Sequence, residues 1–237
     1  MIQIEVWSDI VCPWCYIGKR RLERALANHP GEVSVEWRSF QLDPSTPTGD
    51  PRTVGESLAA RKGLSPSQVK GMFAHVTGIA AEEGLAYDFD RARTANTLDA
   101  HRLLHFAKAG GRQGELKERL LRAYFTEGAD VGDHTVLASL AAETGLDEVA
   151  AKQALADGSY AEDVEADIAQ AREYGISGVP FFVFNQRLGV SGAQPLEVFE
   201  QALAQSSLTV LRAPSDSSSS SSSASASGEC TDDSCAI

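Results

Sequence analysis

Two cysteines in the sequence Cys12-Pro13-Trp14-Cys15 are the residues of this chain best placed to do chemistry. Thiols at positions i and i+3 of a helix are neighbours, so they can form and break a disulfide with little backbone movement. The unpaired amides at a helix N-terminus stabilise an anion, so we expect the thiol of Cys12 to ionise readily. The pair therefore predicts thiol–disulfide exchange, in which Cys12 is the nucleophile and Cys15 resolves the mixed disulfide.

The residues around this pair predict a strand followed by a helix. Residues 2–6 alternate between apolar and polar side chains, which is the period of a strand. Pro13 suits the first helical position, where its missing N–H needs no partner. The apolar stripe of the helix that follows consists of Cys15, Gly18, Leu22, Ala25 and Leu26. We therefore expect Cys12 to cap this helix and Cys15 to lie on its inward face.

Other uses of two closely spaced cysteines remain open at this point. A buried structural disulfide and half of a zinc site both have cysteines at this spacing. Attachment of a haem is excluded, because Tyr16 and not a histidine follows Cys15.

A second motif lies near the other end of the chain. Gly178-Val179-Pro180 precedes the apolar run Phe181–Phe184, which is typical of a buried strand. Proline is tolerated at the start of such a strand, and Val179 before it is biased toward extended geometry. The residues themselves do not decide whether the Val179–Pro180 bond is cis or trans.

Together these motifs resemble the DsbA-like branch of the thioredoxin superfamily, and within it the FrnE-type oxidoreductases named from polyketide pathways. The resemblance covers residues 1–207. The segments that carry it are DIVCPWCYIGKRRLE, NTLDAHRL, SGVPFFVFN and VSGAQP.

The resemblance implies a thioredoxin-like fold with a helical insertion and dithiol–disulfide exchange at Cys12 and Cys15. It also implies a cis Val179–Pro180 bond opposite the disulfide, where the backbone of Val179 pairs with an extended substrate segment. Trp14, Val179 and Pro180 are therefore the expected substrate-binding residues. No cofactor and no metal are expected.

The fold class expected from the whole chain is α/β, with four parts in sequence. Residues 1–44 and 175–210 form the thioredoxin-like domain, and residues 45–174 form a large all-helical insertion. Residues 211–237 form a disordered, serine-rich tail that ends in two further cysteines.

Local patterns place further elements within this plan. Residues 33–38 form a second strand, parallel to the first because a helix connects the two. Ser65–Gln68 reads as a capping box within the helical stretch. After a turn, residues 188–190 form another strand, and a final helix runs from Pro195 to about Ala204.

Composition bears on location and partners. The net charge of −12 argues against nucleic acid, and no stretch approaches the roughly 20 apolar residues of a membrane helix. Met1–Ile10 lacks the basic start of a signal peptide, so a cytoplasmic location is expected. The expected partners are a protein or small molecule bearing a thiol or disulfide, and a cellular reductant of the thioredoxin or glutathione type.

Two clusters of polar residues suggest functional roles, but each cluster has a simpler structural explanation. The first is basic and is expected to be a solvated helix face; it comprises Lys19, Arg20, Arg21 and Arg24. The second comprises Asn96, Asp99, His101 and His105. The two histidines share a helix face at a spacing that suits a metal, but no third ligand is evident, so we expect polar core or rim residues. The resemblance places Asn96 or His101 as candidates for the substrate groove.

Three interpretations of the two tail cysteines, Cys230 and Cys235, are possible from the sequence. The two cysteines are incidental members of a disordered acidic end, or a tethered second dithiol that exchanges with the Cys12–Cys15 disulfide, or ligands of a four-cysteine zinc site. A flexible linker from Leu211 to Cys230 spans roughly 25 Å root-mean-square, which is comparable with the radius of a domain.

Two other functional classes compete with the oxidoreductase. One is a glutathione-dependent isomerase or transferase of the 2-hydroxychromene-2-carboxylate isomerase type, whose members resemble this fold but have serine where Cys12 stands. The other is a peptide-binding or chaperone module without redox turnover.

Overall fold

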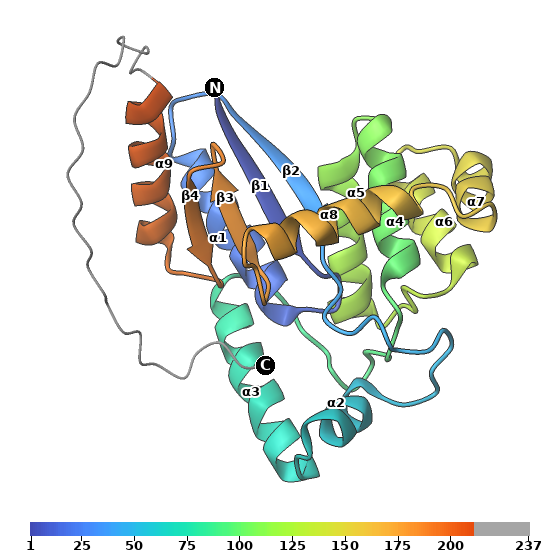
Figure 1. The fold of residues 1–237 in the computed structure, drawn as a ribbon. Helices are drawn as coiled ribbons and strands as arrows, with labels where there is room; N and C mark the ends of the chain where they lie inside the picture. Colours follow the sequence, from blue (N-terminus) through green and yellow to red (C-terminus); the bar gives the residue numbers. More distant parts are fainter. Residues whose placement is uncertain (211–237) are drawn as a thin grey trace.

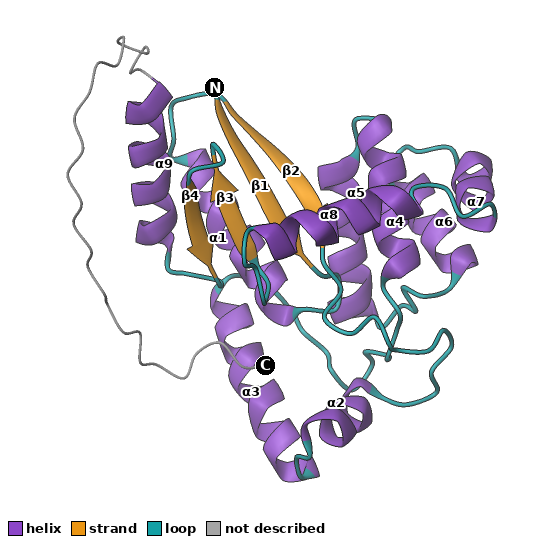
Figure 2. Ribbon diagram, viewed as in Figure 1, coloured by secondary structure: helices purple, strands orange, loops and turns teal. Residues whose placement is uncertain are grey.

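The computed structural model describes residues 1–210, which form a four-stranded sheet with helices on both faces and a helical region beside it (Figures 1 and 2). The thioredoxin-like α/β fold with a helical insertion is confirmed. The expected tail, including Cys230 and Cys235, lies outside the described residues.

The sheet has the order β2-β1-β3-β4. Its strands are β1 (Ile2–Ser8), β2 (Val33–Ser39), β3 (Phe181–Phe184) and β4 (Leu188–Ser191). β1 pairs with β2 in parallel and with β3 in antiparallel register, and β3 pairs with β4 in antiparallel register. The predicted second strand and its parallel pairing are therefore confirmed, because the connecting helix returns the chain in the same direction.

The two faces of the sheet are covered by different helices. α1 (Pro13–Ala27) and α9 (Leu196–Val210) pack on one face, where Leu22 and Phe199 are buried against the strands. α8 (Ala161–Glu173) crosses the other face (Figure 1). There Trp7 is fully buried, and its indole Nε1 donates a hydrogen bond to the carbonyl oxygen of Asp167 at 2.9 Å.

The helical region occupies the chain between β2 and β3. A bundle of α4–α7 lies beside β2, whereas α2 and α3 form a separate arm below the sheet in the view of Figure 1. The elements are α2 (Val54–Lys62), α3 (Pro66–Glu82), α4 (Leu98–Ala109), α5 (Gln113–Arg122), a π-helical turn η1 (Ala123–Glu127), α6 (His134–Glu143) and α7 (Glu148–Ala156). The core of this region includes Tyr16 and Ile17 of α1, so it is continuous with that helix.

Local sequence signals set several helix ends. The predicted capping box is present: the amide of Gln68 donates to Ser65 Oγ at 3.3 Å, and the amide of Ser65 donates to Gln68 Oε1 at 2.8 Å. The last helix runs six residues beyond the predicted Ala204, to Val210. It continues because Ser206, although polar, is buried, and its carbonyl oxygen accepts a hydrogen bond from Asn185 at 3.3 Å.

The basic cluster on α1 is not the solvated face that was predicted. Lys19 is only 4% exposed, and its ammonium contacts Glu118 of α5 at 2.5 Å. Arg21 and Arg24 both contact Glu83, just after α3, at 2.6 and 2.8 Å. The prediction was wrong for Lys19 and Arg21, because carboxylates distant in sequence fold over them, whereas Arg24 is 56% exposed. Within residues 1–210, no helix is long and apolar enough to span a membrane.

Candidate active site

The dithiol lies at the start of α1, as the sequence predicts. Cys12 is the N-cap residue with extended backbone angles (φ −90°, ψ 113°), and Pro13 occupies the first turn. The amide of Cys15 donates to the carbonyl oxygen of Cys12 at 3.0 Å. Both cysteines are free thiols, and each is 1% exposed. A reaction of Cys12 with any external molecule would therefore require the atoms that cover it to move aside.

A cis peptide bond joins Val179 to Pro180, and the loop that contains it faces the dithiol. The thiol of Cys12 donates to the carbonyl oxygen of Val179 at 3.4 Å across 167 residues of sequence. The close approach of this loop to α1 depends on Gly18, because a Cβ at that position would lie 3.1 Å from side-chain atoms of both Pro180 and Phe182. The tertiary structure thus brings Cys12, Val179 and Pro180 together.

The third expected substrate-binding residue, Trp14, is half-buried. It packs against the core of the helical region rather than standing free in solvent. Its ring therefore helps to attach the active-site helix to that region.

The environment of Cys15 favours its protonated form. Burial raises the pKa of the Cys15 thiol well above its usual range, and the adjacent Cys12 thiol adds to the rise. The ammonium of Lys117 acts in the opposite direction, because a nearby cation favours a thiolate. The thiol of Cys15 is therefore protonated before any reaction, and the ammonium of Lys117 is a nearby cation that favours its ionisation.

Lys117 of α5 was not identified from the sequence. It is fully buried, and its Nζ has no hydrogen-bond partner. Burial lowers its pKa to about 8, although the neighbouring Cys15, Asp9 and Cys12 favour the charged form. A signal was present, since Lys117 lies one position after Leu116 and three before Leu120, on the apolar stripe of the helix.

Asp9 lies three residues before Cys12 and is a buried carboxylate. One of its oxygens accepts hydrogen bonds from the amide of Ile10 at 2.7 Å and from His101 Nε2 at 3.2 Å, and the other accepts from the amide of Leu42 at 2.8 Å. Burial opposes its ionisation, but these hydrogen bonds outweigh burial and lower its pKa. Burial also lowers the pKa of His101, so a neutral imidazole donates Nε2–H to Asp9.

The two histidines of α4 have different carboxylate partners. His105 Nε2 lies 3.0 Å from Asp167 and 3.1 Å from Ser39 Oγ, on the side of α8 and β2. Both histidines are buried, which confirms the interpretation as polar core residues. Among residues 1–210, no group of three or more histidine, cysteine, aspartate or glutamate side chains is arranged to hold a metal.

Asn96 secures the loop before α4. Its Nδ2 donates to the carbonyl oxygen of Thr46 at 2.7 Å, and its Oδ1 accepts from the amide of Leu98 at 2.9 Å. The side chain therefore connects this loop to the segment between β2 and α2.

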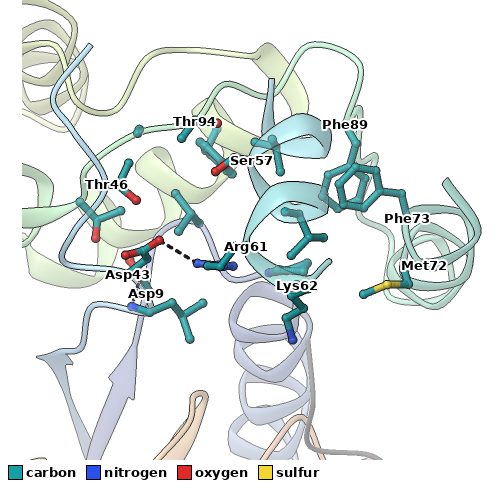
Figure 3. A pocket seen from close by; sticks show the side chains of 18 of the residues that line it. Asp9, Asp43, Thr46, Ser57, Arg61, Lys62, Met72, Phe73, Phe89 and Thr94 are labelled. Carbon is teal, nitrogen blue, oxygen red and sulfur yellow. Dashed lines mark hydrogen bonds and ion pairs between the residues drawn. The ribbon is translucent and has the colours of Figure 1, made fainter. Parts of the chain in front are cut away.

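A pocket of about 440 Å³ lies between the α2–α3 arm and the loop that carries the dithiol (Figure 3). Val11 and Pro13, on either side of Cys12, are among the residues that line it. The stacked rings of Phe73 and Phe89 form another wall.

Comparison with known proteins finds chains similar to this one. The chain is 43% identical to the solved structure of a probable DsbA oxidoreductase, SCO1869, from Streptomyces coelicolor, with a TM-score of 0.83 over 91% of this chain and 93% of that chain. It is 31% identical to the uncharacterized protein YwbO of Bacillus subtilis (strain 168), over 86% of this chain and 96% of that protein.

A more distant likeness is to the cytosolic disulfide reductase DsbM from Pseudomonas aeruginosa. The two are 21% identical with a TM-score of 0.61, over 88% of this chain and 99% of that chain, which shows a shared fold. The model of the DSBA-like thioredoxin domain matches residues 3–204. This chain therefore belongs to the DSBA-like thioredoxin domain family.

Proposed function

We propose that this protein is a thiol–disulfide oxidoreductase of the FrnE type, with Cys12 as the nucleophile and Cys15 as the resolving thiol. The observation that carries the proposal is the position of the Cys12 sulfur, at the N-terminus of α1 and 3.4 Å from the carbonyl oxygen of Val179. An anion at that point meets unpaired helix amides, and the Val179 backbone next to it is available to an extended substrate.

The exchange proceeds in two steps. The Cys12 thiolate attacks one sulfur of a substrate disulfide, forms a mixed disulfide and releases the other sulfur as a thiolate. Cys15 then loses its proton and attacks the Cys12 sulfur, which releases the substrate as a second thiolate and leaves a Cys12–Cys15 disulfide. The cation of Lys117 favours the ionisation of Cys15 at this step. Electrons pass only between sulfurs, so no cofactor takes part.

The substrates that we propose are thiol- or disulfide-bearing proteins or small molecules, bound beside Trp14, Val179 and Pro180. We place the protein in the cytoplasm, where a thioredoxin- or glutathione-type reductant would return the disulfide to the dithiol. The likeness to DsbM, a cytosolic disulfide reductase, supports this direction of electron flow.

Reduction of insulin by dithiothreitol tests the proposal. We expect Cys12→Ser to lower the catalysed rate by about 100-fold or more, because the nucleophile is lost. Cys15→Ser should instead accumulate a mixed disulfide at Cys12, seen as added mass under non-reducing conditions. Equal rates for the parent and Cys12→Ser would rule out the oxidoreductase.

The same variants separate the competing classes. A glutathione-dependent isomerase or transferase would yield isomerised or conjugated products, which chromatography with glutathione detects. A chaperone module would suppress aggregation of unfolded insulin equally well with and without Cys12.

We also propose that the tail thiols exchange with the active-site disulfide. Cys230 and Cys235 lie outside the described residues, so support comes from linker length and effective concentration alone. Replacing both with serine should change the turnover or the reduction potential of Cys12–Cys15. If neither changes, the tail has no redox role.

A further inference from the structure

The pocket between the α2–α3 arm and the dithiol loop has the size of a small-molecule site. Its volume of about 440 Å³ falls within the roughly 300–1,000 Å³ of ligand pockets. Most of its wall comes from α2, α3 and the loop before α4. The exchange described above uses none of these segments, so the pocket needs an explanation of its own.

The pocket reaches the residues on both sides of Cys12, although Cys12 itself does not line it. Val11 and Pro13 both line it, and the Cα atom of each lies about 3.8 Å from that of Cys12, the spacing of consecutive trans residues. Val179 approaches Cys12 through its carbonyl oxygen and does not line the pocket. A molecule held in the pocket would therefore touch the residues next to Cys12, and its reaction with the sulfur requires the buried Cys12 side chain to become accessible.

The walls of the pocket suit a flat apolar group. The rings of Phe73 and Phe89 are stacked with centroids 4.1 Å apart and planes 4° from parallel (Figure 3). Leu58 and Val76 add aliphatic surface, and Met72 adds a deformable thioether. Aromatic groups pack favourably on such a surface by stacking or by edge contacts.

The charges around the pocket leave one cation without a partner. Asp9 accepts three hydrogen bonds, and Asp43 accepts from Ser45 and from Arg61 at 3.2 Å. Lys62 at the mouth forms no hydrogen bond or ion pair with any residue of the described chain. Lys62 is therefore the cation available to pair with an anionic group on a molecule bound there.

We propose that this pocket binds small aromatic disulfides or thiols that carry a carboxylate or sulfonate, and presents their sulfur to Cys12. The inference rests on the proposed function and names its substrate class. The aromatic part lies against Phe73 and Phe89, and the anionic group lies near Lys62.

The chemistry balances with an aryl disulfide as the oxidant. The Cys12 thiolate attacks one aryl sulfur, so a Cys12–S–S–aryl bond forms, the aryl disulfide bond breaks and one aryl thiolate leaves. The Cys15 thiolate then attacks Cys12, the second aryl thiolate leaves and the Cys12–Cys15 bond forms. Two electrons pass from the dithiol to the aryl disulfide, and the two thiol protons pass to solvent.

A binding measurement tests the pocket without any redox step. The probe is 1-anilinonaphthalene-8-sulfonate, an aromatic anion, titrated by fluorescence against the full chain. Ser57→Trp fills the pocket and should weaken binding about tenfold, and Lys62→Glu should weaken it about fivefold. Ala60→Trp and Lys70→Glu, exposed on α2 and α3 but outside the pocket, should leave binding within about twofold. Equal binding by the parent and both pocket variants would overturn the proposal.

Exchange kinetics test the substrate class. Full-length protein with Cys230→Ser and Cys235→Ser is reduced, freed of reductant and mixed with 5,5′-dithiobis(2-nitrobenzoate), 4,4′-dithiodipyridine or bis(2-hydroxyethyl) disulfide. Ser57→Trp should slow both aromatic probes about tenfold and leave the small polar disulfide within about twofold. Lys62→Glu should slow only the carboxylated probe, about fivefold.

The two measurements fail separately. If the parent exchanges with no disulfide but binds the fluorescent anion in the pocket, the oxidoreductase falls and the ligand class stands. If the parent exchanges with all three disulfides and the pocket variants change no ratio between them, the oxidoreductase stands and the pocket has no part in substrate choice.

Discussion

Two buried lysines, Lys19 of α1 and Lys117 of α5, differ in the side chains that surround them. Lys19 is 4% exposed and contacts two carboxylates, Glu23 and Glu118, each at 2.5 Å. Lys117, next to Glu118 in sequence, is fully buried, and its ammonium has no hydrogen-bond partner. One lysine attaches two parts of the fold, whereas the other faces the dithiol and Asp9.

The two lysines differ in whether their buried ammonium groups have carboxylate partners. A buried cation with good partners is costly mainly when one partner is removed, whereas an unpartnered one is costly in the native state itself. Unsatisfied polar groups are uncommon in folded proteins and concentrate at functional sites. Removing a carboxylate partner of Lys19 should therefore lower the stability of the fold, whereas removing the charge of Lys117 should raise it.

The largest expected effect is at the paired site. Glu118→Ala leaves Lys19 buried with only half-exposed Glu23 as its partner, and it also removes the acceptor of Tyr16 and Arg20. We expect the free energy of unfolding in urea to fall by about 2–3 kcal/mol.

Glu148→Ala is the matched control, because Glu148 pairs with Lys152 at an exposed position four residues away on one helix. Its effect should stay within about 0.5 kcal/mol. Similar losses for the two variants would show that burial of Lys19 does not matter.

The next effect has the opposite sign. Lys117→Met replaces a buried ammonium that has no hydrogen-bond partner, and whose nitrogen lies 5.7 Å from the centroid of the Trp37 ring, with an apolar side chain of similar size. We expect the free energy of unfolding at pH 7 to rise by about 1–3 kcal/mol. Lys152→Met, at an exposed position, should change it by less than about 0.5 kcal/mol. A loss of stability in Lys117→Met would mean that the ammonium stabilises the fold.

The difference in stability between Lys117→Met and the parent should also depend on pH. The pKa of Lys117 is about 8 when folded against an ordinary value of 10.5. Between these values the unfolded chain binds the proton and the folded protein does not, so the stability of the parent gains from rising pH in this window. Lys117→Met lacks this gain, and its advantage over the parent should shrink from pH 8 to pH 10.5. A constant difference across the window would contradict the lowered pKa.

The smallest expected effect is at Arg24, whose ion pair with Glu83 is the more exposed of the two that Glu83 forms. Arg24 is 56% exposed and shares Glu83 with Arg21, whose side chain is 16% exposed. We expect Arg24→Ala to cost less than about 0.5 kcal/mol in thermal or urea unfolding. Arg21→Ala should cost more, because Arg21 also donates to the carbonyl oxygen of Ala193 at 2.6 Å. Equal losses would remove the distinction between buried and exposed pairs.

Much of the site could be predicted because its signals are local. The placement of Cys12 at the helix start follows from the strand pattern before it and Pro13 after it. The capping box at Ser65 and the apolar run of β3 likewise lie within a few residues of the features that they predict.

Predictions failed where side chains met from distant parts of the chain. The basic residues of α1 looked solvated until Glu83 and Glu118 were folded onto them. Lys117 lies 102 residues after Cys15, a separation that no short motif spans. The pocket likewise combines six segments of the chain, and hydrophobic periodicity describes each segment only by itself.

The amino-acid sequence by itself determined that two thiols stand one turn apart at the beginning of a helix, because strand period, proline and apolar stripe are all short-range properties. Only the tertiary structure decided what lies around those thiols: the Val179 carbonyl, the amine of Lys117, and the pocket between the α2–α3 arm and the loop that carries Cys12. The physical reason is that burial, charge pairing and cavity shape depend on which distant segments pack together, and packing depends on the whole chain.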